Sequence, residues 1–479
     1  MKNIIWIALA VLCCAAPSQV FAVPGDSDPR AMGLGQAYTA LARGPQSAFW
    51  NPANLALSGN RKFHWNFLGA GFSTVFENNS FSMTTYNDNF TESNDKVSPN
   101  GSKYYISPKD KDDIMSDIPG EGLRMNFDFE PMIAAGIPIN GGIAFPLPAG
   151  MQAAVSIGLN MGFEGEVPKD MFELFLFGND FERNRLAAGK DGGYDISDWD
   201  GSGWAVGSLN FSGAKAMMPA PLKPYLSEFT VGGTFKVSGG AYGEALESGG
   251  GGLISRFDGA DVDAYVISQS ATGVGFGVDV GVAAISKNRK LTISAGLLNL
   301  LDTFSWSGDP RQDSLFIKAS DLVVTRFADP ENQDIESVLD NEDVDNDGDI
   351  DFHKELASKS FSRSLPAMLR LGVAYNLLSN LTVVGNWDQA FSTGFGVETA
   401  PRIATGVEYR LVSWFPTRFG LSAGGRGSSS SIGFAFGPFN TASLQVSLLE
   451  TAFVTRGGFF PGVAKGTALS VQFFRLNLI

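Results

Sequence analysis

Polar and apolar residues alternate in short segments along most of this chain. In Arg124–Glu130 every even-numbered residue is polar and every odd-numbered residue is apolar, and residues 229–238, 369–375, 402–411 and 443–448 show the same period. A period of two gives a β-strand one apolar face and one polar face. The chain is therefore expected to be all-β, and this alternation fits a soluble sandwich as well as a membrane barrel.

The number of such segments favours the barrel. A membrane strand that is tilted needs about 9–11 residues, and single-chain bacterial barrels prefer even strand numbers. Some segments are expected to be loop or plug hairpins, so we predict a transmembrane antiparallel β-barrel of about 14 strands, with a range of about 12–16. The candidate strands start near Phe63, Phe81, Leu123, Gln152, Val206, Phe229, Val262, Gly277, Leu291, Leu369, Leu381, Ile403, Phe419, Ile432, Ser443 and Leu469.

The N-terminus has the features of a secretory signal. Lys2 supplies a positive charge, and residues 4–16 form an apolar core that is too short to span a bilayer comfortably. Val20-Phe21-Ala22 fits the small-residue pattern before a cleavage site. Residues 1–22 are therefore predicted to be a signal peptide, which implies export from the cytoplasm.

Both cysteines of the chain, Cys13 and Cys14, lie inside the predicted signal. The mature chain would then contain no cysteine, which excludes disulfides and thiolate metal sites. A lipoprotein anchor is the alternative, but Val11 and Leu12 precede the pair where a lipidation site needs small residues. A closed barrel does not need disulfides, because every strand is paired with its neighbours.

The charge and hydropathy of the chain narrow its class further. Without Lys2 the chain has 34 basic and 50 acidic residues, and such an acidic balance argues against nucleic acid as a partner. The mean hydropathy is +0.02 and 18% of the residues are charged. A helical membrane protein would be far more apolar and a soluble protein usually more charged. A barrel averages lipid-facing and lumen-facing residues to this middle value.

One uncharged stretch, Pro131–Phe163, is long enough for a transmembrane helix. Four prolines and a glycine pair interrupt it, and each proline inside a helix costs about 3 kcal/mol. Asn140-Gly141 is in addition a signal for a hairpin turn. We therefore predict two strands and a turn here.

Residues 30–57 form a short segment of small residues that ends in Trp50-Asn51-Pro52-Ala53-Asn54. This segment resembles the N-terminal plug of FadL-type outer-membrane barrels, and also the start of the PorV-like barrels of type IX secretion. The similarity extends more loosely through Ile118-Pro119 and Gly406–Arg410. The chain thus looks like a member of an uncharacterised group of PorV/FadL-like barrels.

The resemblance implies a domain plan and a gate. Residues 23–60 would be a plug inside the barrel, and residues 61–479 would form the outer-membrane barrel. The plug could gate a path for a hydrophobic ligand, or it could be a structural lid that moves little. The predicted plug and gate residues are Phe49, Trp50, Asn51 and Pro52.

Three polar insertions interrupt the strands, near residues 86–122, 161–203 and 308–363. In the first, residues 107–117 begin with Ser-Pro-Lys-Asp, which predicts a capped helix. The second contains a predicted short helix at Lys169–Phe177.

The third insertion has 12 acidic residues and one lysine between Asp329 and Glu355. It contains part of a calcium loop, with oxygen ligands at alternate positions and Gly348 at the sharp turn. Lys354 stands where a bidentate carboxylate is usual, so we expect weak calcium binding, with a dissociation constant of about 0.1–1 mM. A solvated acidic loop without metal remains the alternative. The predicted calcium ligands are Asp343, Asp345, Asp347, Asp349 and Asp351.

Residues suited to catalysis are scarce. The two histidines, His64 and His353, lie on a predicted first strand and in the acidic loop, and neither forms a recognisable catalytic pair. The run Gly249–Gly252 lacks the lysine and following helix of a phosphate-binding loop, and it is interpreted as a hairpin turn. We therefore expect a protein that is not an enzyme.

Two functions remain open for a barrel in the bacterial outer membrane. The FadL resemblance implies binding or passage of a hydrophobic small molecule. The PorV resemblance implies a scaffold for protein secretion or surface attachment, with a protein of the secretion machinery as partner. In both cases outer-membrane lipid surrounds the barrel, and calcium is the one cofactor that the sequence suggests.

Overall fold

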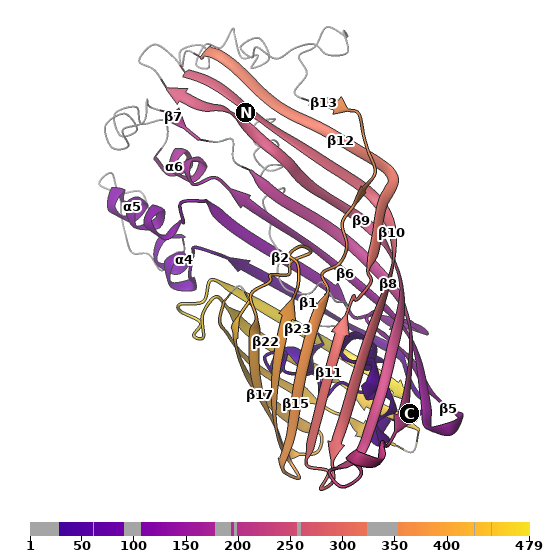
Figure 1. Ribbon diagram of the computed structural model, residues 1–479. Coiled ribbons are helices and arrows are strands. Elements are labelled where there is room, and N and C mark those ends of the chain that lie inside the picture. The colour runs from indigo at the N-terminus through magenta and orange to yellow at the C-terminus, as the bar shows by residue number, and fades with distance from the viewer. Residues whose placement is uncertain are drawn as a thin grey trace.

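The described chain forms a closed antiparallel β-barrel (Figure 1). Its wall has fourteen strand positions, counted around the barrel. The wall closes where β1 (His64–Asn78) pairs with β23 (Gly466–Leu478). The prediction of an all-β barrel of about 14 strands is confirmed. The computed structural model describes residues 28–60, 62–90, 107–177, 193–195, 199–255, 260–322, 353–425, 427–441 and 443–479.

Two of the fourteen positions are built from two strands each that follow one another along the wall. These are β2 (Leu123–Pro131) with β5 (Gly141–Leu147), and β11 (Leu291–Leu298) with β12 (Thr303–Leu322). The other wall strands between β1 and β23 are β6 (Met151–Val167), β8 (Asp200–Met217), β9 (Leu226–Ser255), β10 (Ala260–Ser286), β15 (Met368–Leu378), β16 (Leu381–Ala390), β17 (Arg402–Val412), β18 (Phe415–Gly424), β19 (Ser429–Phe436) and β22 (Leu449–Arg456).

Short strands attach to this wall at several points. They are β3 (Ala134–Ala135), β4 (Ile137–Pro138), β7 (Gly193–Tyr194), β13 (His353–Leu356), β14 (Phe361–Ser362), β20 (Phe439–Asn440) and β21 (Leu444–Ser447).

The alternation seen in the sequence places polar side chains in the lumen and apolar side chains on the outside. On β9, Thr230, Thr234 and Lys236 are buried, whereas Phe235 and Val237 are exposed on the outer surface. An apolar exterior around a polar interior is the arrangement of a barrel that faces lipid. The described chain thus has a wall suited to a bilayer.

The two ends of the barrel differ. At one end short turns join neighbouring strands, such as residues 379–380 between β15 and β16, and 413–414 between β17 and β18. At the other end β9 and β10 reach 30 and 27 residues and rise well above the rest of the wall (Figure 1). Because short turns face the periplasm in bacterial barrels, the long strands and connections mark the extracellular mouth.

Two expected strands differ from the structure. No strand begins at Phe81, because the Asn78 side chain accepts hydrogen bonds from the amides of Ser80 and Phe81, at 2.8 and 2.5 Å, and turns the chain out of the wall. The strands expected at Val262 and Gly277 are one strand, β10, since its glycines lie against inward-facing rings of the next strand and do not form a turn.

Strands that continue into polar segments explain the other differences. Residues 308–322 belong to β12 and pair with β10, so the third insertion starts later than expected. Likewise β6 continues to Val167, and β8 already begins at Asp200. Gly249–Gly252 lies within β9, and the expected hairpin turn there is wrong.

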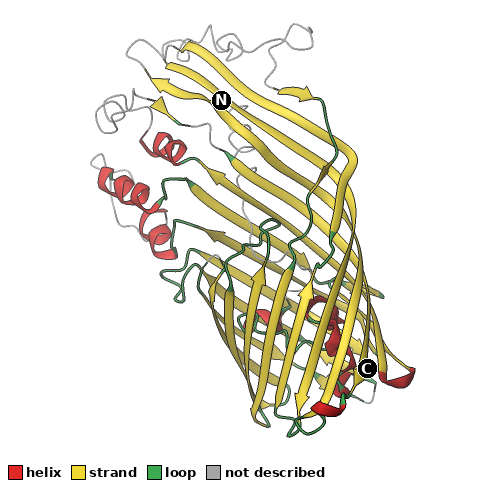
Figure 2. Cartoon of the chain, viewed as in Figure 1, coloured by secondary structure: helices red, strands yellow, loops and turns green. Residues whose placement is uncertain are grey.

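Short helices lie in three places of the described chain: inside the lower barrel, beside the mouth, and in turns at the lower rim (Figure 2). The predicted helices are confirmed as α5 (Pro108–Asp117), which starts with a complete Ser107–Asp110 capping box, and α6 (Lys169–Phe177). None of the described helices is long and apolar enough to cross a bilayer. The remaining helices outside the lumen are α4 (Met83–Phe90), η4 (Pro148–Gly150) and η5 (Ala220–Leu222).

Candidate functional site

Residues 28–60, here called the plug, lie inside the lower part of the lumen (Figure 2). Nearly every side chain of residues 28–57 is buried, which fits a segment enclosed by the barrel wall. Its elements are α2 (Pro29–Gly33), η1 (Gly44–Gln46), α3 (Ser47–Trp50), η2 (Pro52–Ala56) and η3 (Ser58–Asn60).

The apolar gate residues expected from the sequence, Phe49, Trp50 and Pro52, are buried within the plug. The Trp50 ring makes an edge contact with Tyr38 at 5.4 Å between ring centroids. The guanidinium of Arg370 on β15 lies 4.5 Å from the Trp50 ring centroid, a cation–π contact with the wall. Trp50 therefore joins the interior of the plug to the barrel.

Asn51, the fourth of these residues, bonds to both plug and wall. Its side-chain oxygen accepts from the Ala53 amide and caps η2. Its side-chain nitrogen donates to the carbonyls of Val282 on β10 and Ala295 on β11, at 2.9 and 3.2 Å. One asparagine thus fixes the start of a plug helix against two wall strands.

Glycines on the lumen side of the wall allow the plug backbone to approach closely. A Cβ atom at Gly420 would lie 2.1 Å from the Gly35 nitrogen, and one at Gly281 would lie 2.0 Å from the Asn51 side chain. Any larger residue at these positions would displace the plug. The five wall glycines with such contacts, here called the glycine seat, are Gly232, Gly281, Gly372, Gly406 and Gly420.

Buried ion pairs join the plug to the wall on the periplasmic side. Glu408 on β17 accepts two hydrogen bonds from Arg30 of the plug, at 2.8 and 2.9 Å. Arg418 and Arg410 also donate to Glu408, at 2.9 and 2.7 Å. Glu408 is only 2% exposed, so its charge depends on these three arginines for compensation.

A second carboxylate extends this network across the lumen. Glu450 on β22 pairs with Arg418 at 2.7 Å and with Arg475 on β23 at 2.5 Å. Arg475 also reaches Asp28 at the start of the plug, at 3.3 Å. The sequence analysis did not select these residues as a site, although alternation had placed Glu408 and Arg410 on the polar face of their strand. The plug ion network consists of Asp28, Arg30, Glu408, Arg410, Arg418, Glu450 and Arg475.

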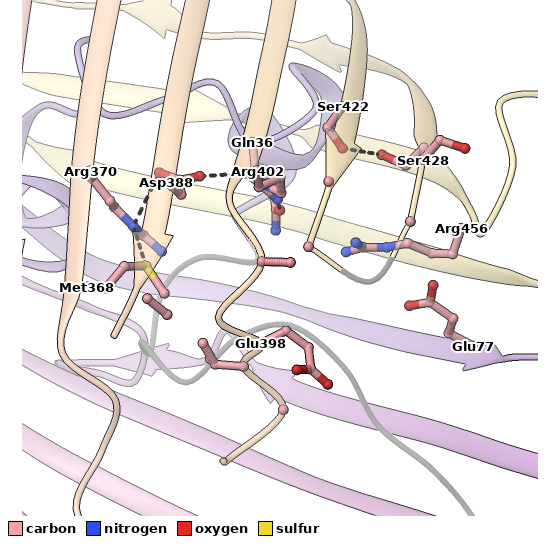
Figure 3. A pocket seen from close by; sticks show the side chains of 18 residues that line it. Gln36, Glu77, Met368, Arg370, Asp388, Glu398, Arg402, Ser422, Ser428 and Arg456 are labelled. Carbon is pink, nitrogen blue, oxygen red and sulfur yellow. Dashed lines mark hydrogen bonds and ion pairs between the residues drawn. The ribbon is translucent and has the colours of Figure 1, made fainter. Parts of the chain in front are cut away.

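A small cavity of about 70 Å³ separates the plug from the extracellular mouth (Figure 3). Residues 391–401, here called the lid loop, contribute to its wall, and Gln36 of the plug lines it from the other side. Arg402 bonds to Gln36 and pairs with Asp388 at 3.1 Å. Asp388 also lies 3.9 Å from Arg370. Ion pairs of Arg402 and Arg370 with Asp388 thus lie beside apolar lining residues such as Met368 and Val397.

Phe395 packs the lid loop against a cluster of aromatic side chains. Phe395 is 1% exposed, and its ring centroid lies 5.0 Å from that of Tyr242 and 5.8 Å from that of Trp204. Its φ of 52°, between Gly394 and Gly396 that also have positive φ, is a strained conformation for a bulky residue. Such strain persists only where the surroundings hold it. The aromatic cluster around it comprises Trp204, Tyr242, Phe304, Trp306, Phe361 and Phe395.

The pairing of the wall with β6 is interrupted between β2 and β5. Residues 132–140, here called the interruption, do not pair with β6, although Ala134 and Ala135 (β3) still pair with β1. The Asn140 side chain bonds instead to the backbone of Pro131 and Leu159. The amide nitrogen of the Gln46 side chain donates to the Asn140 carbonyl at 3.1 Å, so the plug touches this interruption. On its outer side Ile137 is 71% exposed toward the lipid. Plug, interruption and lipid face are therefore adjacent.

The predicted calcium ligands Asp343, Asp345, Asp347, Asp349 and Asp351 lie outside the described residues. The described chain contains no cluster of three or more histidine and carboxylate side chains placed to hold a metal. Of the two histidines, His64 lies on β1 and His353 begins β13, far apart along the wall. Calcium binding by the acidic loop thus stays a prediction.

The fold is similar to those of several solved barrel structures. A FadL homologue from Pseudomonas aeruginosa matches with a TM-score of 0.51 and 12% identity, over 97% of this chain and 98% of that one. The CymD monoaromatic hydrocarbon channel matches with a TM-score of 0.47 and 10% identity, over 95% and 97%. The Pseudomonas putida toluene transporter TodX gives 0.44 and 9%, over 97% and 98%. At these identities the likeness concerns the fold alone, and the expected FadL-like barrel fold is confirmed.

Sequence comparison is less informative. Residues 244–443 match a family of unknown function (DUF5723). No curated protein sequence is significantly similar to the chain.

Proposed function

We propose that this barrel binds an apolar small molecule at its extracellular mouth and passes it inward past the plug. The observation that carries the proposal is the aromatic cluster on the lumen side of the mouth. Phe304 and Trp306 stack at 4.2 Å between centroids, and Tyr242 lies 5.4 Å from Trp306. Apolar ligands are bound by aromatic surfaces of this kind.

Phe395 supports a binding role for this cluster. Its side chain fills the space between Trp204 and Tyr242, as an apolar ligand would, and its backbone is strained. A ligand that displaced Phe395 would relieve that strain and free the lid loop. The small cavity beneath the lid loop and above Gln36 would then open toward the mouth.

The interruption at residues 132–140 supports an exit toward the lipid. The polar plug ion network is a poor surface for an apolar molecule, because burying its charges against apolar groups costs free energy. At the interruption, by contrast, exposed Ile133 and Ile137 adjoin the plug contact of Gln46. In this proposal the residues Phe49, Trp50, Asn51 and Pro52 hold the plug that closes the direct path to the periplasm.

The test is binding of an apolar fluorescent probe, N-phenyl-1-naphthylamine, to the full chain in liposomes. Wild-type protein should show saturable binding above that of empty liposomes. Trp306→Ala should weaken binding about tenfold, as expected for a lost ring contact of about 1.5 kcal/mol. Phe395→Ala should tighten probe binding, because the Phe395 side chain no longer occupies the space between Trp204 and Tyr242.

Phe391→Ala is the matched control, since Phe391 begins the same loop but is 60% exposed. It should bind the probe as the wild type does. Absence of saturable binding in wild type and Phe395→Ala alike would contradict the proposed function. The PorV-like role, with a protein of the secretion machinery as partner, stays a prediction that no described contact favours over apolar passage.

A further inference from the structure

A cavity of about 760 Å³ lies between the plug and the periplasmic end of the barrel. Trp414 in the β17–β18 turn and Phe439 on β20 line it near the short-turn end. Tyr38 and Gln46 of the plug line it from within the lumen. This cavity, here called the vestibule, is distinct from the aromatic cluster, which lies on the opposite side of the plug.

The vestibule has an excess of positive charge. Five arginines line it, and three carboxylates accompany them: Asp28 and Glu450 in its wall, and Glu408 bonded directly behind. The described lining therefore carries two more positive charges than negative ones, with His64 counted as neutral. The five arginines are Arg30, Arg43, Arg410, Arg418 and Arg475.

Arg43 differs from the other four arginines. One of its terminal nitrogens donates to the carbonyls of Ala40 and Ala42, at 3.0 and 2.8 Å, and no described carboxylate pairs with it. Burial lowers the pKa of the Arg43 guanidinium to about 10, so it stays charged at neutral pH. Its remaining donors are unused by the described residues. A guanidinium with two unused N–H groups can donate two parallel hydrogen bonds to a carboxylate or a phosphate.

Two further polar atoms of the vestibule lining are buried without a hydrogen-bond partner in the described chain. They are Nε2 of His64, beside the Gly44 backbone, and the side-chain oxygen of Gln46. Asn66 and Ser413 add polar groups to the same wall. A cavity of this kind satisfies its buried donors only when an acceptor enters.

We propose that the vestibule is a binding site for a small oxyanion of charge minus two, a phosphate or dicarboxylate that enters from the periplasm. Arg43 and Arg410 receive the anion, while Arg30, Arg418 and Arg475 remain paired within the plug ion network. An organic body attached to the anion would pack on Trp414 and Phe439. The soluble molecule is the source, because the vestibule lies inside the wall and away from the lipid face.

The experiment is calorimetric titration of the folded full chain in detergent with inorganic phosphate and, separately, with succinate. Both anions should bind saturably in a buffer of low ionic strength. Arg43→Gln should weaken binding of each anion about tenfold, since one charge-assisted contact is lost. Arg410→Gln, whose side chain is already 47% exposed, should weaken it several-fold.

Arg124→Gln is the matched control. Arg124 pairs with Glu166 between β2 and β6, away from the vestibule, so both affinities should be unchanged. Arg43→Lys should keep part of the affinity, and heat-modifiable migration on gels verifies that each variant is folded. Lack of saturable binding, or equal affinity of wild type, Arg43→Gln and Arg410→Gln, would overturn the proposal. Since no apolar probe is used, the outcome is independent of the proposed passage of an apolar molecule.

Discussion

Replacing Glu408 with glutamine should loosen the plug without opening the wall. The change removes the carboxylate to which Arg30 of the plug donates two hydrogen bonds. Arg418 keeps Glu450 as a partner, and Arg410 is half exposed and regains water, so neither adds much to the cost. The main loss is the Arg30 pair, and breaking a buried pair of this kind costs about 3 kcal/mol.

A cysteine reporter measures this loss. Both native cysteines lie in the predicted signal, so Ser47→Cys in the buried helix α3 would be the one thiol of the cleaved chain. When a buried site reacts only in an open state, its modification rate follows the opening equilibrium. A loss of about 3 kcal/mol therefore predicts maleimide labelling faster by about a hundredfold in Glu408→Gln.

The matched control is Glu166→Gln, which breaks the Arg124–Glu166 pair between β6 and β2 far from the plug. A partly exposed pair contributes up to about 1 kcal/mol, and it does not touch the plug, so the labelling rate should stay within about threefold. Equal labelling rates in Glu408→Gln and in the parent would refute the reasoning, because the ion network would then not hold the plug.

Two further predictions concern the wall and the acidic loop. Asn140→Ala removes three hydrogen bonds that bridge the interruption and should lower the free energy of unfolding by about 2–3 kcal/mol. The measurement is the denaturant concentration at which half of the protein loses the gel mobility of the folded barrel. An unchanged midpoint would contradict a bridging role. Millimolar calcium should protect the loop that contains Asp343–Asp351 from protease in the folded protein, because a bound cation offsets the repulsion of five carboxylates. Equal cleavage with and without calcium would leave a solvated loop.

Local periodicity was sufficient to predict the wall. The alternation in Arg124–Glu130 and along β9 depends only on which face of the strand meets lipid. In the structure the polar residues of these strands are mostly buried in the lumen and the apolar ones face outward. The capping box at Ser107 is likewise a local signal, and α5 begins there. Strand ends were harder to predict, because residues 308–314 of β12 lack large apolar side chains on either face and resemble a loop in composition.

The plug contacts depend on pairs that no local pattern encodes. Arg30 and Glu408 are separated by 378 positions in the chain. Their pairing could not be predicted until the barrel had brought β17 around to α2. In the sequence, Gly406 and Gly420 stand at positions of the alternation where a polar side chain is expected. Their contact with the plug could not be predicted without knowing where the plug lies.

The glycine seat has a consequence for how the chain assembles. It takes contributions from β9 and β10, made midway through synthesis, and from β17 and β18, made near its end. The plug is made first, and its docking surface also includes Glu450 on β22 and Arg475 on β23, so this surface is complete only when the last strands arrive. Contacts this distant in sequence form late and slowly. We therefore expect the plug to dock as β23 pairs with β1, so that a chain arrested before its last strands would insert with an unfilled lumen.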